Sequence, residues 1–87
     1  MDAALITFSS STSANRLKKL ALKEQLYNIN LMQTPKAISQ NGCTYSIKCP
    51  LNQLSDLLQL ADHYHVAHGY VYRETRDVEG RKFYQKL

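Results

Sequence analysis

The sequence has few of the residues and runs that mark specialised protein classes. It contains only two cysteines and no Cys-x-x-Cys pair, so a disulfide-stabilised scaffold is excluded. No apolar run approaches the roughly 18 residues that a membrane span needs. The apolar stretch near the start, residues 3–8, is short and follows Asp2 rather than basic residues, so we expect no signal peptide. We therefore expect a cytoplasmic protein that does not act at a membrane.

The chain also lacks the sequence patterns of most enzymes. No Ser/His/Asp set, no paired carboxylate motif and no glycine-rich nucleotide fingerprint occurs in its 87 residues. We therefore expect no cofactor and no free-standing enzymatic activity. The net charge of +4 is spread along the chain without a block of five like charges, which permits an anionic partner without requiring nucleic acid.

The length and the hydrophobic pattern predict one small α+β domain over residues 1–87. A strand is expected over 3–8, and a helix follows to about Leu26, capped by Thr12 or Ser13. Further strands are expected over 27–34, 43–49 and 69–74, with a second helix from 51 or 52 to 65. This order fits the ferredoxin-like βαββαβ sandwich, in which two helices cover one face of an antiparallel four-stranded sheet. Residues 81–87 provide an extra C-terminal strand.

The two cysteines are expected to have separate roles. Cys43 and Cys49 are six residues apart on one predicted strand, about 20 Å when extended, so they can share neither a disulfide nor a metal ion. Cys43 follows a loop and is the candidate reactive thiol, with Lys36 able to approach it across the hairpin. The alternative is that Cys43 packs beside Tyr45 and Ile47 as a small buried hydrophobe.

The loop before Cys43 is the candidate binding segment. It is longer than most hairpin connections and supplies polar groups and turn residues, which favours a binding role. The candidate binding residues are Thr34, Pro35, Lys36, Ser39 and Gly42. The alternative is a plain connection in which Ile38 enters the core. Ser9–Ser13 could bind an anion or only cap a helix, and we expect this stretch at the opposite edge of the sheet from the loop.

Histidines and tyrosines near the end of the second helix suggest two further sites. His63, His65 and His68 are close in sequence, but a helix does not place them on one face, so we expect no metal site. Tyr70 and Tyr72 share one sheet face, which could stack on RNA, although the usual aromatic RNA-binding motif is absent. Self-association through that open sheet face is the preferred interpretation, by analogy with other ferredoxin-like domains.

Three stretches resemble a known family. "TFSSSTSANR" resembles the family pattern F-x-S-T-x-x-A, "QTPKAIS" resembles P-T-P-R-x-I-S, and a cysteine beside a glycine follows. Over Leu5–Tyr72 the chain thus resembles the small Se/S (selenium/sulfur) carrier protein-like domains. It differs from them in having Lys36 for arginine, Gln33 for proline, and the order Gly42-Cys43 in place of Cys-Gly.

The resemblance implies the ferredoxin-like fold and a carrier function. Cys43 would hold sulfur or selenium as a persulfide or selenopersulfide, and the partners would be donor and acceptor proteins. The alternative function is a non-catalytic regulatory module that binds a small ligand or a protein through the 34–43 loop or the open sheet face.

Overall fold

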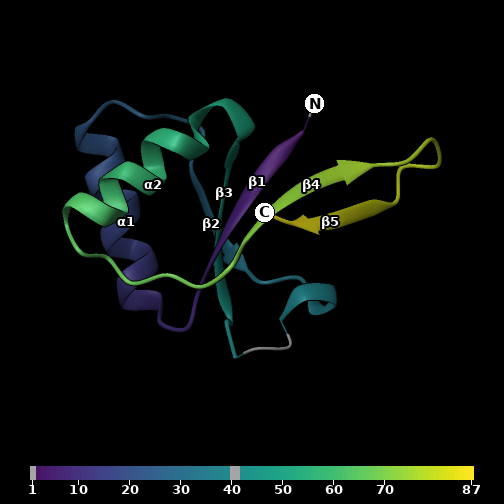
Figure 1. Cartoon of the computed structure of the whole chain (residues 1–87), viewed down its shortest axis with the longest axis horizontal. Coiled ribbons are helices and arrows are strands. Elements are labelled where there is room, and N and C mark those ends of the chain that lie inside the picture. Colours follow the sequence, from purple (N-terminus) through teal and green to yellow (C-terminus); the bar gives the residue numbers. More distant parts are fainter. Residues whose placement is uncertain (1, 40–41) are drawn as a thin grey trace.

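The computed structural model describes residues 2–39 and 42–87. The described residues form two α-helices, five strands and two short 3₁₀ turns (Figure 1). The elements are β1 (Ala3–Phe8), α1 (Ser11–Lys23), β2 (Asn30–Gln33), η1 (Lys36–Ile38), β3 (Tyr45–Pro50), η2 (Leu51–Gln53), α2 (Leu54–His63), β4 (Val71–Arg76) and β5 (Lys82–Lys86).

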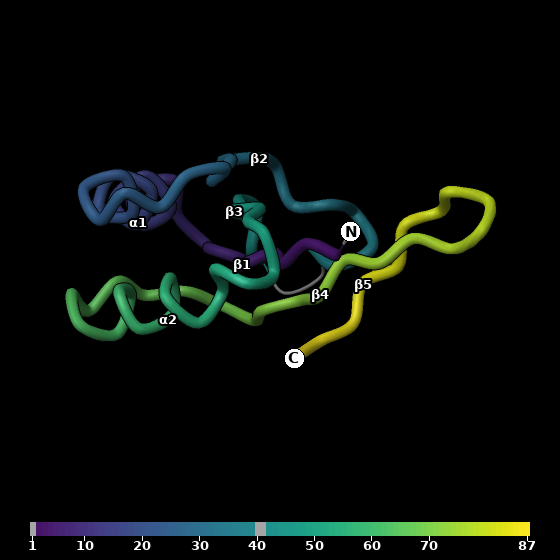
Figure 2. The backbone as a smooth tube through the Cα atoms, turned by 90° about the horizontal axis from the view of Figure 1, so that it is seen from above, coloured from purple at the N-terminus to yellow at the C-terminus, as the bar shows by residue number. Residues whose placement is uncertain are grey.

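The sheet has the strand order β2-β3-β1-β4-β5, and all neighbouring strands are antiparallel. Helices α1 and α2 lie on the same side of it (Figure 2). The first four strands and the two helices therefore form the predicted α+β arrangement. The sheet has five strands rather than four, because β5 pairs with β4 along the edge that a four-stranded sheet would leave open.

The start of α1 differs from the prediction. Ser10, not Thr12 or Ser13, is the N-cap: its backbone is extended, with φ −136° and ψ 134°, and its hydroxyl oxygen accepts the Thr12 and Ser13 backbone N–H groups. The helix therefore begins at Ser11 and ends at Lys23. Its buried residues recur at spacings of three and four: Ala14, Leu17 and Ala21.

The core lies between the sheet and the helices. On β1, Ile6 and Phe8 point toward the helices and are fully buried against Leu17 of α1 and Leu57 of α2. Each such side chain contributes about 1.5–3 kcal/mol through burial. This packing fixes which face of each strand is turned inward, and with it the register of the sheet.

The register brings the ends of β1 and β2 and the start of β3 together at one end of the strands, which we call the shared sheet edge. Phe8 at the end of β1 pairs with Tyr45 at the start of β3, and Tyr45 pairs in turn with Gln33 at the end of β2. The prediction that Ser9–Ser13 and the 34–43 loop lie at opposite edges is therefore wrong. Helix α1 returns the chain before β2 begins, so β2 runs parallel to β1 with β3 between them, and both strands end at the same edge (bottom of Figure 1).

The sheet face away from the helices is less open than expected. The loop that precedes β3 lies on that side (Figure 2). Leu5 and Thr7 of β1 point away from the helices, yet they are only 0% and 1% exposed. Lys48 and Tyr72 flank Leu5 on the adjacent strands. In the described part of the chain, no helix is long and apolar enough to cross a membrane.

Candidate functional site

The candidate site lies at the shared sheet edge, where three segments converge. These are the end of β1 with the start of α1, the loop between β2 and β3, and residues 66–70 between α2 and β4. Backbone hydrogen bonds join Thr7 of β1 to Gly69 and Tyr70, and Thr34 to Thr44 across the loop. Cys43 precedes Thr44, so the candidate thiol belongs to this edge.

The third segment meets β1 through a bulge. Thr7 accepts a hydrogen bond from the Gly69 N–H (2.7 Å) and donates its own N–H to the Tyr70 carbonyl (3.1 Å). Gly69 and Tyr70 thus both face Thr7, as in a β-bulge, which locally changes the direction of the backbone. The Thr7 hydroxyl also donates to the Tyr70 carbonyl at 2.6 Å. The bulge explains why β4 begins at Val71 rather than at the predicted Gly69.

The Cys43 sulfur packs where a side chain at residue 69 would lie. A Cβ atom placed on Gly69 would be 2.7 Å from Cys43 Sγ and 2.8 Å from Thr7 Oγ1. Glycine is needed there for space, because the Gly69 backbone is not in the left-handed region. Cys43 itself lies just before β3 and is partly exposed, so it is not a buried residue of the β3 core face as the alternative prediction had it.

A small polar cavity lies beside the loop, at the same end of the sheet as Cys43, although Cys43 is not one of its lining residues. It has a volume of about 260 Å³ and is lined by Gln33, Thr34, Ser39, Thr44 and Tyr45. None of these side chains is charged. The Thr34 and Ser46 hydroxyl oxygens are 2.7 Å apart and share a buried hydrogen bond, which fixes the wall nearest the sheet.

The predicted binding loop has the turn chemistry that its residues suggest. Pro35 precedes the short η1 turn with φ −56° and ψ 143°, and the Ser39 hydroxyl donates to the Lys36 carbonyl (3.4 Å) at its end. Gly42 has a φ of +78°, which favours glycine. Asn41, which precedes Gly42 and with it suggests a turn in the sequence, lies outside the described residues. Thus Thr34 and Ser39 line the cavity, while Pro35 and Gly42 shape the backbone around it.

Lys36 is exposed on η1. The polar contacts of the described residues include none between its ammonium group and Cys43, so the proposed approach of Lys36 to the thiol stays a prediction. The N-terminus of α1 is at the same sheet edge as Cys43 and has no acidic residue in its first turn. The positive end of that helix dipole therefore contributes a favourable field for an anion at this edge.

The two cysteines have contrasting environments. Both are free, as predicted, but Cys49 is only 2% exposed within the core. Burial raises the pKa of the Cys49 thiol from its ordinary value of 9.0 to about 11. Cys49 therefore remains a protonated, inaccessible thiol at neutral pH, and Cys43 is the cysteine available for chemistry.

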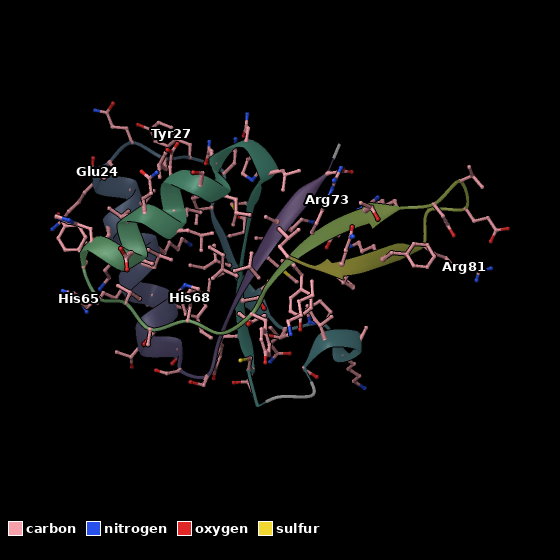
Figure 3. All side chains as sticks on the ribbon, in the orientation of Figure 1. Glu24, Tyr27, His65, His68, Arg73 and Arg81 are labelled. Atoms are coloured by element: carbon pink, nitrogen blue, oxygen red, sulfur yellow. The ribbon has the colours of Figure 1, made fainter. Side chains whose placement is uncertain are left out.

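The histidines do not form a cluster. Figure 3 shows His65 at the outer tip of the helix layer and His68 farther along the connection toward the sheet. His68 Nδ1 lies 2.7 Å from the Gly69 carbonyl oxygen, within hydrogen-bonding distance. Among residues 2–39 and 42–87, no group of three or more His, Cys, Asp or Glu side chains is placed to hold a metal ion.

Thr7 and Gly69 were not predicted as site residues. Their role depends on contacts between segments that are far apart in the sequence. The one local signal is a glycine directly before a strand of alternating pattern, which is typical of a bulge or a close backbone approach.

Comparison with known proteins identifies one family. A family described as "Putative Se/S carrier protein-like" matches residues 3–73. No significant match was found among curated proteins or among solved structures. The matched region runs from the start of β1 into β4 and therefore includes Thr7, the 34–43 loop, Cys43 and Gly69.

Proposed function

The chain belongs to the putative Se/S carrier protein-like family, and from this premise we propose that it carries sulfur or selenium on Cys43 between a donor and an acceptor protein. Such a carrier is not an enzyme, because the chain takes up and gives away one atom stoichiometrically. Its requirements are one accessible thiol and an environment that tolerates the terminal anion of a persulfide.

The transfer step is a thiol–persulfide exchange. The Cys43 thiolate attacks the outer sulfur of a donor persulfide, a new S–S bond forms on Cys43, and the donor S–S bond breaks. The donor leaves as a thiolate and takes up the proton that Cys43 lost, so the exchange involves no net oxidation. The same exchange in reverse delivers the atom to an acceptor thiol, and a selenopersulfide reacts in the same way.

The observation that carries the proposal is the position of the Cys43 sulfur. Cys43 is a free and partly exposed residue, and its sulfur packs beside Gly69 at the edge where the N-terminus of α1 also lies. A donor thiol can approach a residue at a sheet edge more easily than one on a covered face. The N-terminal end of the α1 helix dipole, which lies at the same end of the sheet and has no acidic residue in its first turn, supports a terminal S⁻ or Se⁻.

The experiment uses glutathione persulfide as the donor and intact-protein mass spectrometry as the readout. The expected result is a mass increase of one sulfur atom, located on the Cys43 peptide and removed by dithiothreitol. Cys43→Ser abolishes the increase, while Cys49→Ala retains it as the matched control. Unmodified wild-type protein, or equal modification of the Cys43→Ser variant, would rule the carrier role out.

A second function is favoured by the cavity. Its hydroxyl and amide lining, without charged residues, suits a small polar ligand held by neutral hydrogen bonds. A regulatory module that binds such a ligand through the 34–43 loop would not need Cys43. Titration with glycerol, a neutral polar probe, should shift the NMR signals of the lining residues. Thr34→Val, which removes one hydroxyl from the lining, should reduce these shifts, and Cys43→Ser should leave them unchanged, which separates this function from the carrier role.

A further inference from the structure

The two helices have opposite charge. Helix α1 has four basic residues and no acidic one, whereas the segment from Leu51 to His63 has two acidic residues and no lysine or arginine. The basic residues are Arg16, Lys18, Lys19 and Lys23, and the acidic ones are Asp56 and Asp62. In a chain of net charge +4, α2 is thus a local negative region beside a positive one.

The outer surface of α2 is grooved and partly apolar. One hollow, of about 570 Å³, lies between α2 and the chain that follows α1, with Glu24 and Asp56 beside Leu26, Leu60 and Tyr64. A second hollow, of about 530 Å³, has Leu51, Leu54 and Leu58 beside Asp62. Gln59 lines both hollows, so they flank one ridge of the helix. Grooves on either side of a ridge are the surface on which a second helix packs.

Helix α1 has the complementary surface. Leu22 is 50% exposed, an unusual position for a leucine on a helix that already packs its other side on the core. Lys19 lies three residues before Leu22 on the same side of the helix, and Arg16 and Lys23 lie three and four residues from Lys19; all three cations are exposed. The ion pairs within the described residues involve none of these three cations and neither Asp56 nor Asp62. Both sets of charges are therefore available to another molecule.

We propose that a second copy of this chain binds through the helix layer, with α1 of each copy packed on the acidic grooves of its partner's α2. The two helices lie side by side on one face of the sheet, so a single two-fold axis forms both contacts at once (Figure 2). Leu22 enters an apolar part of a groove while the surrounding lysines approach the carboxylates.

This interface replaces the sheet face as the site of self-association. At the centre of the sheet face, Leu5 and Thr7 are already fully covered within one copy. The helix layer has exposed apolar side chains and unpaired charges of both signs. Because the charges are at the surface, the contact is sensitive to salt: the Debye length falls from about 10 Å at 0.1 M to about 3 Å at 1 M.

Two charge-reversal variants test the proposal by sedimentation velocity. Arg16→Glu/Lys19→Glu/Lys23→Glu leaves α1 with three glutamates and one lysine and so makes it acidic, and Asp56→Lys/Asp62→Lys makes α2 basic. Wild-type protein should form a concentration-dependent dimer at low salt, with a Kd at least ten-fold weaker at 0.5 M salt. Each variant alone faces two repulsive contacts and should be monomeric. An equimolar mixture of the two should form a heterodimer, because both of its contacts are attractive.

The control is Arg76→Glu/Lys82→Glu/Lys86→Glu on the β4–β5 hairpin, which makes the same change in charge as the α1 variant but away from the helices and should dimerise like the wild type. Leu22→Ser should weaken the dimer without altering charge, and circular dichroism verifies that each variant is folded. A wild-type protein that remains monomeric at low salt would overturn the proposal. So would a dimer that the helix variants leave intact, which would assign self-association to another face.

Discussion

Replacing Gly69 with alanine tests the packing of the Cys43 sulfur most directly. The added methyl group would lie 2.7 Å from Cys43 Sγ and 2.8 Å from Thr7 Oγ1, distances that real Cβ atoms do not show. One of the two side chains must move, or the bulge must open. We therefore expect Gly69→Ala to destabilise the fold and to change the reactivity of a thiol that the substitution does not touch.

The magnitude follows from two opposing effects. Overpacking a tight site costs about 1–3 kcal/mol. Because the Gly69 backbone is outside the left-handed region, alanine also reduces the entropy of the unfolded chain, which stabilises by about 0.4–1 kcal/mol. The expected net loss in the free energy of unfolding is about 1–2 kcal/mol, which lowers the Tm of a domain of this size by roughly 4–16 °C.

Urea denaturation in two backgrounds isolates the contribution of the sulfur. In a Cys43→Ala background the contact with Sγ is gone and only that with Thr7 remains, so Gly69→Ala should cost less by at least about 0.5 kcal/mol. Alkylation of Cys43, followed by mass spectrometry with the buried Cys49 as internal reference, should change in rate. Equal cost in both backgrounds and an unchanged rate would refute the placement of the sulfur against Gly69.

Three further predictions concern parts of the structure away from Gly69. Because burial raises the pKa of the Cys49 thiol, the stability that the protonated thiol contributes is complete below pH 9 and is lost as the pH rises from about 9 to about 11. A Cys49→Ala variant should therefore show a smaller decline of the urea midpoint over this pH range than the wild type. Lys48→Met leaves the buried carboxylate of Glu74 without its cation at 3.0 Å and should cost about 2 kcal/mol in chemical denaturation. Adding Glu74→Gln to that variant should recover part of the loss, and failure to recover any would contradict an electrostatic cause. Ser10→Ala should cost about 1 kcal/mol through loss of the N-cap, whereas Thr12→Ala, which keeps the cap, should cost less in thermal melts.

The overall fold was predictable because periodicity and turn residues agree along most of the chain. Ile29 is buried and Leu31 packs against the core, in agreement with the alternation of asparagine and apolar residues over 28–31 in the predicted strand 27–34. Cys43 and Cys49 are too far apart to form a disulfide because an extended strand separates residues that are six positions apart, and both thiols are free in the structure. Such inferences succeed where local geometry determines the outcome.

The relation between the two ends of the site was predicted wrongly for a topological reason. Whether Ser10 and the 34–43 loop lie together depends on the direction of β2 relative to β1, which the crossover through α1 decides. The contact between Cys43 and Gly69 joins residues 26 positions apart and depends on a bulge that periodicity does not reveal. The N-cap was placed too late because any of several consecutive hydroxyl residues satisfies the cap pattern.

The hairpin of β4 and β5 projects beyond the helices, and its outer strand lies past residue 73, where the family match ends (Figure 1). Strand β5 occupies the hydrogen-bonding edge of β4 and moves the free edge of the sheet to a strand with Lys82 and Lys86 near its ends. Charged lysines on an edge strand discourage edge-to-edge polymerisation. Residues 82–86 therefore act as a built-in protection against aggregation, and a chain shortened after β4, at Arg76, would expose the edge of that strand to other molecules in concentrated solution.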